Sequence, residues 1–476
     1  MATLIRSTLP RMSLAVLLLL GTMAAYGVVS LPSLIARWGI SAPGLGVLFL
    51  WGMFAAAICH VARKSPAWGD YLPILVGIAM LRIAFGGISL DRVSPGDPHA
   101  YLVIAQQLID GRGYYFDEPF MGLRTRAFFP PGYPIVLAGW GAVFGLSTWS
   151  VLALATLIDM AAAIVIARIG ARLDSAAAGR AAALLYLVWP SVLFDAPLAA
   201  KEGLCTLLVL VIAQQWIDVA RGAAIGWRRV AALGVAAGWL TLTQPGLSAV
   251  AALFGMALVG PIGWRRMMRL GVPAAAIALA VLMPWWVRNW LVFGAFVPLT
   301  SAGGLSLWIG NNPDATGAWM PPPPSLRGLP ELEYSRRAAA MAYDWMLAHP
   351  VDAARLTLAK LLRATGVAQF GLVRLAAMYP PISHMLAAML LPLAQGSHVL
   401  MMATGAAAAR AGRSGAVSIL VLLVAACLAQ LLLFGMWFEF GERHRTFLTP
   451  FLLLLSASVA ADWRGWPVLR YRSVAA

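Results

Sequence analysis

The residues best suited to chemistry lie between Ser94 and Pro134, a polar stretch in an otherwise apolar chain. Four of the 19 acidic residues of the chain fall in this stretch, and three arginines accompany them: Asp97, Asp110, Asp117 and Glu118, with Arg112, Arg124 and Arg126. A carboxylate can take a proton from a hydroxyl as a general base, and a guanidinium matches the oxygens of a phosphate. Such groups beside an apolar segment predict a site at the boundary between water and lipid.

Asp97 is the best candidate base in this stretch. In the segment SPGDPHAY, Pro95 and Pro98 suit the start of a helix, which places Asp97 at or near the N-cap. Tyr101 then follows one turn later on the same helix face. Two roles stay open for Asp97: a plain helix cap, or a general base whose pKa is raised by burial against the membrane. Asp117 and Glu118, before Pro119, are interpreted as a solvated turn or as the next carboxylates to test.

Composition places the chain among membrane proteins. Of its 476 residues, 61% are hydrophobic and only 11% are charged, which excludes a soluble globular protein. The net charge is +16, but the arginines sit in short links between apolar runs, a pattern typical of cytoplasmic loops and not of a nucleic-acid surface. The three cysteines and six histidines show no metal-ligand spacing. We therefore assign no metal and no cofactor and expect no nucleic-acid partner. A divalent cation held by Asp97 with Asp117 or Glu118 stays open as an alternative.

The apolar runs predict about 12 transmembrane helices, because only helices satisfy their own backbone groups in lipid. The runs lie at about 12–35, 44–62, 71–90, 149–167, 180–194, 202–220, 229–243, 247–262, 270–290, 383–405, 415–436 and 446–462. The run 132–146 has about 15 apolar residues, too few to cross ~30 Å of hydrocarbon. It is expected to lie in or re-enter the outer interface.

With the basic links placed in the cytoplasm, two polar regions face the other side of the membrane. The chain is thereby divided into three N-terminal spans, a first outer loop with juxtamembrane helices, central spans, a large outer loop and C-terminal spans: 1–90, 91–148, 149–290, 291–381 and 382–476. The large loop combines glycine and proline turns with a helical pattern from Glu331 to Gly366, and we expect it to pack over the first loop.

Several short motifs occur in an order and topology that resemble those of a known family. They are Asp97 with Tyr101, Pro130-Pro-Gly-Tyr-Pro134, Lys201-Glu202-Gly, Pro284-Trp-Trp-Val-Arg-Asn289, Gly310-Asn-Asn-Pro with Thr316-Gly317, and Glu442-Arg-His-Arg445 before Pro450. Together they cover most of the chain and resemble the GT-C fold of membrane glycosyltransferases. The most similar branch looks like the protein O-mannosyltransferase and aminoarabinose transferase group, families 39 and 83. The chain departs from that pattern at Pro98, where relatives often have Glu, and at Gln244, where many have Arg.

The resemblance implies a donor in which a polyprenyl phosphate carries one sugar. The sugar would pass to a hydroxyl of a lipid, glycan or protein at the extracytoplasmic face of a bacterial plasma membrane. Asp97 would act as the base, and cations at the outer boundary would hold the leaving phosphate. The candidate substrate-binding residues are Tyr101, Arg126, Lys201, Glu202, Arg288, Arg443 and Arg445. Each cation could instead anchor the chain in the headgroup layer, and Glu202 could serve only as the ion-pair partner of Lys201 or of an arginine.

Two other function classes stay open, and one buried charge lacks an assigned partner. The chain could be a different polyprenyl-linked glycan enzyme, such as an oligosaccharide ligase or phosphotransferase, or it could be a lipid or solute transporter. Arg82 falls in the middle of the third predicted span, where a charge needs a partner or a polar cavity. The sequence names neither that partner nor the sugar and acceptor.

Overall fold

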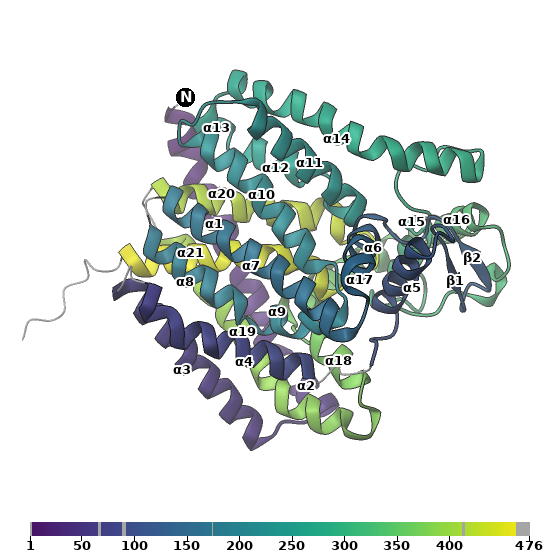
Figure 1. Cartoon of the computed structure of the whole chain (residues 1–476), viewed down its shortest axis with the longest axis horizontal. Coiled ribbons are helices and arrows are strands. Elements are labelled where there is room, and N and C mark those ends of the chain that lie inside the picture. The colour runs from purple at the N-terminus through teal and green to yellow at the C-terminus, as the bar shows by residue number, and fades with distance from the viewer. Residues whose placement is uncertain (1, 65–67, 88–91, 174, 412–414, 463–476) are drawn as a thin grey trace, which may run out of the picture.

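The chain folds into an all-α bundle with a small two-stranded sheet at one end (Figure 1). The computed structural model describes residues 2–64, 68–87, 92–173, 175–411 and 415–462. The predicted all-α polytopic class is confirmed. The third predicted span and the last predicted region each extend past these ranges, at residues 88–90 and 463–476 respectively.

The helices follow the apolar runs closely. The first half of the chain contains α1 (Ala2–Val29), α2 (Leu31–Trp38), α3 (Ala42–Lys64), α4 (Leu72–Gly87), α5 (Asp97–Ile109), α6 (Gly132–Phe144), α7 (Thr148–Arg172), α8 (Ala176–Leu187), α9 (Pro190–Asp195), α10 (Glu202–Ala220) and α11 (Trp227–Thr243). The second half contains α12 (Val250–Ala257), α13 (Val259–Ile262), α14 (Trp264–Phe293), α15 (Gly303–Gly310), α16 (Glu331–Ala348), α17 (Pro350–Gly366), α18 (Phe370–Ala377), α19 (Ser383–Ala411), α20 (Gly415–Gln430), the 3₁₀ turn η7 (Glu442–Leu448) and α21 (Thr449–Asp462).

Fewer helices than expected have the length of a full span. Within the described ranges, seven helices are long and apolar enough to cross a membrane. The pair α8 and α9, bent by 40°, makes eight if it counts as one span. The predicted count of about 12 is therefore not confirmed. The run 247–262, predicted as one helix, is broken into α12 and α13. At 13 residues, α6 spans only about 20 Å at 1.5 Å per residue.

The bundle is apolar on its outside as well as in its core. Large side chains such as Leu18, Phe49, Met80 and Leu279 are more than half exposed on α1, α3, α4 and α14. The interior is packed with aliphatic residues from α10, α20 and α21. A water-soluble protein would not expose this many large apolar side chains, so the outer surface matches what a lipid environment requires.

The basic links expected in the cytoplasm contact one another. Asp218 on α10 forms ion pairs with Arg172 at 3.2 Å and with Arg229 at 2.7 Å. Arg266, at the start of α14, donates to the backbone oxygen of Ala223 at 2.7 Å. Three basic links that are far apart in sequence are therefore joined at one end of the bundle.

The two regions predicted to face outward pack together at the end that carries the sheet (Figure 1). Strands β1 (Phe116–Glu118) and β2 (Leu123–Thr125) form a hairpin, with Asp117 opposite Arg124. Met121 from the hairpin packs with Trp308 of α15 and with Tyr334 and Ala338 of α16. We call this unit the cap: the hairpin, α15 and α16.

A buried glutamate that the sequence analysis missed fixes the cap to the first loop. Glu331, only 8% exposed, accepts hydrogen bonds from the backbone nitrogens of Arg126 at 2.6 Å and Ala127 at 2.9 Å. The hydroxyl of Ser301 donates to the same carboxylate at 2.5 Å. Three donors satisfy this charge, so Glu331 fixes α16 to the segment at Arg126, about 200 residues earlier in the chain.

The intramembrane charge Arg82 has a partner in the neighbouring helix. Its Nη2 lies 2.8 Å from Oδ2 of Asp159 on α7, and both side chains are 5% exposed. Tyr186 on α8 also donates to Asp159, at 3.3 Å. The pair satisfies two charges that would each be costly alone in lipid, and it joins α4, α7 and α8.

Candidate functional site

The turn before α5 leaves the carboxylate of Asp97 available for contacts outside its own helix. The N-cap is Gly96, with φ 82°, and Asp97 is the first residue of α5, which agrees with its predicted place at or near the N-cap. The hydrogen bond of its carboxylate goes to Arg443 and not to the backbone of α5. A Cβ at residue 96 would lie only 3.1 Å from Nη1 of Arg374, which also donates to the backbone oxygen of Pro95. Glycine is favoured here by the positive φ, which other residues rarely adopt. The plain capping role considered for Asp97 is excluded.

Asp97 forms an ion pair with Arg443, a residue 346 positions away in the chain. Oδ2 of Asp97 lies 2.5 Å from Nη1 of Arg443. The side chain of Asp97 is 29% exposed and that of Arg443 is 14% exposed, so the pair is mostly buried but can still be reached from solvent. The guanidinium of Arg443 also lies 5.4 Å from the ring centre of Phe370. Two residues that were predicted separately, one as the base and one as a phosphate ligand, are therefore in direct contact.

The electrostatics of Asp97 differ from the expectation. Burial alone would raise the pKa of its carboxyl, but the positive charges of Arg443, Lys201 and Arg374 outweigh that effect and lower the pKa to about 2. The predicted increase in pKa is therefore wrong, because sequence could not show the three cations. Asp97 is ionised at neutral pH and is a weak proton acceptor there.

Lys201 is a buried cation beside this pair. It lies at the N-cap of α10, two residues after Ala199, whose φ of 52° is left-handed. Its side chain is 8% exposed, and its Nζ lies 5.8 Å from the ring centre of Tyr101. Within the described residues its ammonium has no hydrogen-bond acceptor and no ion pair. Its donors are therefore available to an anionic ligand, and strain at Ala199 is consistent with a functional position.

Glu202 and Tyr101 complete the walls around Asp97. Glu202, also 8% exposed, forms no ion pair within the described part of the chain, so the predicted pairing with Lys201 or an arginine is not seen. Tyr101 packs edge to face against Phe129 and Tyr133, with ring centres 5.9 and 5.5 Å apart. The segment Pro130–Pro134 thus supports the helix that carries Asp97.

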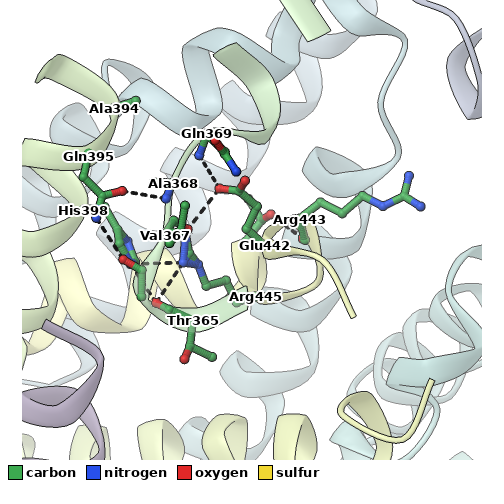
Figure 2. Close-up of polar contacts among 12 residues, drawn as sticks. Thr365, Val367, Ala368, Gln369, Ala394, Gln395, His398, Glu442, Arg443 and Arg445 are labelled. Carbon is green, nitrogen blue, oxygen red and sulfur yellow. Dashed lines mark hydrogen bonds and ion pairs between the residues drawn. The ribbon is translucent and has the colours of Figure 1, made fainter. Parts of the chain in front are cut away.

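Arg445 faces away from Asp97 and is occupied by the protein itself. Figure 2 shows its guanidinium among the backbone oxygens at the end of α17, while the side chain of Arg443 extends away from this group. Nη1 donates to Thr365 O at 3.0 Å and Nη2 to Val367 O at 2.6 Å, and Nη1 lies 3.1 Å from Nε2 of His398. Oε2 of Glu442 lies 3.8 Å away. These contacts tie η7 to α17 and α19.

Arg288 and Arg126 also lie apart from the Asp97 pair. Arg288 donates to the backbone oxygens of Arg126 at 2.7 Å and Tyr114 at 2.9 Å, which fixes the first loop to the end of α14. Its guanidinium also lies 4.9 Å from the ring centre of Trp285. The side chain of Arg126 is exposed. Arg288 thus acts as a structural link, and the contacts of neither residue place it beside Asp97.

A cleft opens on the other side of η7. It has an empty volume of about 580 Å³ and is lined by apolar residues such as Phe194, Phe370 and Met401, together with Arg443 and Asp195. Asp195, at the end of α9, is a further acidic residue that the sequence analysis missed, since it falls at the end of an apolar run. The cleft combines an apolar wall with Arg443 of the site and with the carboxyl residues Asp195 and Glu442, so it is the wall that suits a lipid chain.

The adjacent carboxylates Asp117 and Glu118 face opposite sides of β1. Asp117 is 64% exposed and pairs with Arg124 at 2.8 Å. Glu118 is 5% exposed, and burial, together with the negative charge of Asp97, raises its pKa to about 7. Both residues lie in a strand and not in the predicted turn, and the predicted exposure to solvent holds for Asp117 alone.

The assembled site combines one ionised carboxylate with three cations. Asp97, Arg443, Lys201 and Arg374 come from α5, η7, the start of α10 and α18, so it forms only when these elements pack together. No group of three or more His, Cys, Asp or Glu in the described ranges is arranged to hold a metal ion. Such a site can hold a phosphate through its cations and orient a hydroxyl through its carboxylate.

Comparison with known proteins gives remote likenesses only. No family profile and no curated protein sequence matches the chain. Among solved structures, the archaeal oligosaccharyltransferase AglB from Archaeoglobus fulgidus, in complex with an inhibitory peptide and a dolichol-phosphate, is similar at 10% identity and a TM-score of 0.46. That match covers 83% of this chain, which spans about half (51%) of AglB. ArnT from Cupriavidus metallidurans, bound to undecaprenyl phosphate, is similar at 15% identity and a TM-score of 0.39, over 81% of this chain and 76% of ArnT.

Proposed function

We propose that this chain is a glycosyltransferase that moves a single sugar from a polyprenyl-phosphate donor to an acceptor hydroxyl at the extracytoplasmic face of a membrane. The observation that carries the proposal is the contact between Asp97 and Arg443, with Lys201 and Arg374 close enough to lower the pKa of the carboxyl. A phosphate-linked donor needs cations at the leaving group, and an attacking hydroxyl needs an oriented acceptor for its hydrogen bond.

In this proposal the donor phosphate binds to Arg443 and Lys201. Arg443 presents two parallel N–H donors, and Lys201 adds an ammonium that has no protein acceptor among the residues the structure describes. The lipid chain of the donor extends along the apolar wall of the cleft beside η7. The ionised carboxylate of Asp97 accepts a hydrogen bond from the acceptor hydroxyl and aims its oxygen at the anomeric carbon. The predicted phosphate contacts of Arg445 and Arg288 are not part of the proposal. In each residue both Nη1 and Nη2 already donate hydrogen bonds to backbone oxygens.

The proposal is tested with purified protein in lipid nanodiscs. A panel of radiolabelled polyprenyl-phosphate hexoses and pentoses is offered together with membranes from cells that lack the protein, which supply the acceptor. We expect label to move from the polyprenyl phosphate to a product that Asp97→Asn forms roughly a hundredfold more slowly, because the neutral amide neither pairs with Arg443 as an anion does nor orients the hydroxyl as well. Use of diphosphate-linked donors alone would instead indicate an oligosaccharide ligase or phosphotransferase, and flux of lipid without covalent transfer would indicate a transporter.

The orientation is tested separately with an impermeant thiol reagent on intact cells. In a background without native cysteines, Asp117→Cys and Ala315→Cys should react from outside, and Ser175→Cys should not. Labelling of residue 175 from outside would contradict the placement of the site on the extracytoplasmic face.

A further inference from the structure

The hairpin of the cap directs one buried carboxylate toward the helix that carries Asp97. Side chains alternate along a strand, so Phe116 and Glu118 share one face of β1 and Asp117 takes the other. The ring of Phe116 packs edge to face on His99 of α5, at 6.1 Å between centres, and on Phe129 at 5.5 Å. The face of β1 that carries Glu118 is therefore the face turned to α5.

Glu118 has the surroundings of a carboxylate kept for proton transfer. It is 5% exposed, and within the described residues neither an ion pair nor a side-chain hydrogen bond is seen at its carboxyl group. The backbone amide of Phe120 is the group that stabilises its charged form. Structural glutamates with this degree of burial, such as Glu331, are satisfied by several donors. Glu118 therefore lacks the partners that a purely structural role would require.

We propose that Glu118 takes the proton of the acceptor hydroxyl during sugar transfer. This inference rests on the proposed function. The acceptor oxygen forms its bond to the anomeric carbon as the bond from that carbon to the phosphate oxygen breaks, and its electron pair leaves with the polyprenyl phosphate. The acceptor proton moves to the carboxylate of Glu118, which releases it to water before the next turnover. The hydroxyl has a single proton, which is hydrogen-bonded to Asp97 as the acceptor binds and is passed to Glu118 as the new bond forms. Asp97 thus orients the acceptor and stays ionised throughout.

The two carboxylates have environments that suit these different tasks. The three cations around Asp97 hold its pKa at about 2, whereas burial and the charge of Asp97 raise the pKa of Glu118 to about 7. A base works best when its pKa is close to the working pH, and a pair whose pKa values are pushed apart divides its roles accordingly. The titratable groups that interact with the charge of Glu118 are Asp97 of α5 and Tyr334 of α16. His99 of α5 contacts Phe116 on the same strand, and Arg327 lies against Gly122 at the hairpin turn.

The matched pair Glu118→Gln and Asp117→Asn tests the inference in the nanodisc transfer assay. Because Glu118 must be deprotonated to accept a proton, the parent rate should rise with pH up to about 7 and then level off. Glu118→Gln should lose roughly a hundredfold in rate and should lose this inflection. Glu118→Asp should retain part of the activity. Asp117→Asn, which alters only the exposed face of the same strand, should keep the parent rate and profile.

A spectroscopic readout separates this inference from the proposed function. Difference infrared spectra between pH 5 and pH 9 should show a protonated carboxyl band that disappears with a midpoint near pH 7 in the parent and in Asp117→Asn. Glu118→Gln should lose the Glu118 part of that band, while the part from Glu442, whose pKa burial also raises to about 7, should remain in every variant. Transfer activity with an unchanged rate and profile in Glu118→Gln would overturn the inference alone. Absence of any transfer in the parent would overturn the proposed function. If Glu118→Gln does not fold, the pH–rate profile of Glu118→Asp tests the inference instead. An inflection at the same pH as in the parent would then overturn the role of Glu118 as the base.

Discussion

Arg443 and Arg445 lie two residues apart in η7, yet their side chains meet opposite kinds of partner. Arg443 points toward α5 and contacts a single carboxylate in a partly exposed site. Arg445 points toward α17 and α19, where backbone oxygens and an imidazole fill its fork (Figure 2). One guanidinium can exchange its partner for a ligand, and the other cannot do so without leaving buried carbonyl oxygens unsatisfied.

The same contrast runs through the other predicted cations. Lys201 resembles Arg443, since its buried ammonium has no acceptor in the described part of the protein. Arg288 resembles Arg445, since it holds two backbone oxygens of the first loop. A cation at the end of an apolar run can therefore serve either the ligand or the fold, and its partners show which. The predictions below test this division.

The largest effect is expected at Arg445. Arg445→Met leaves the oxygens of Thr365 and Val367 without a donor and should destabilise the protein by about 3–5 kcal/mol. Chemical or thermal unfolding in detergent measures the loss. Arg443→Met is the matched control and should lose much less stability, because Asp97 stays partly exposed. Equal losses in the two variants would remove the distinction between the two arginines.

Arg443 should control activity instead. Arg443→Gln should fold normally and lose about tenfold to a hundredfold in transfer efficiency, since one charge-assisted contact to phosphate is worth about 1.5–3 kcal/mol. Arg443→Lys should recover only part of this, because an ammonium cannot reproduce the two parallel donors of the fork. Initial rates over a range of donor concentrations provide the measurement. Turnover close to the parent value in a folded Arg443→Gln protein would contradict the phosphate contact.

Lys201 offers a test in which stability and activity should change independently. Lys201→Met removes a buried charge that has no hydrogen-bond acceptor among the described residues, but it also removes the attraction of Lys201 for the Asp97 carboxylate. Because the two effects oppose each other, the stability should change by less than about 1 kcal/mol. Transfer should nevertheless fall about tenfold if the ammonium binds the donor phosphate. Melting temperature and initial rate are measured on the same preparation. A large loss of stability would show that Lys201 supports the fold.

The smallest effect is expected at Arg126. Its backbone is held by Glu331, while its side chain is exposed. Arg126→Gln should change stability by less than about 0.5 kcal/mol and should leave transfer within about twofold of the parent. Glu331→Gln is the informative companion, because it weakens the backbone contact and should destabilise the cap. A tenfold loss in Arg126→Gln would return this side chain to the substrate-binding set.

The sequence by itself determined the features that depend on local pattern. Apolar runs gave helices because backbone groups in lipid must bond within their own segment, and the short run at 132–146 gave α6. The prolines and glycine around Asp97 placed the start of α5 to within a residue. The glycine and proline turns marked the second polar region. Each of these inferences uses neighbours a few positions apart, which a single sequence displays directly.

Only the tertiary structure decided which charges meet. Arg82 and Asp159 lie 77 positions apart, and Asp97 and Arg443 lie 346 apart, so no local spacing could join them. The pKa of Asp97 is low because three separate elements bring cations to it, and Glu118 is buried because β1 turns that face toward α5. A charge interacts with whatever packing places within a few ångströms, and in a helical bundle those neighbours come from distant parts of the chain.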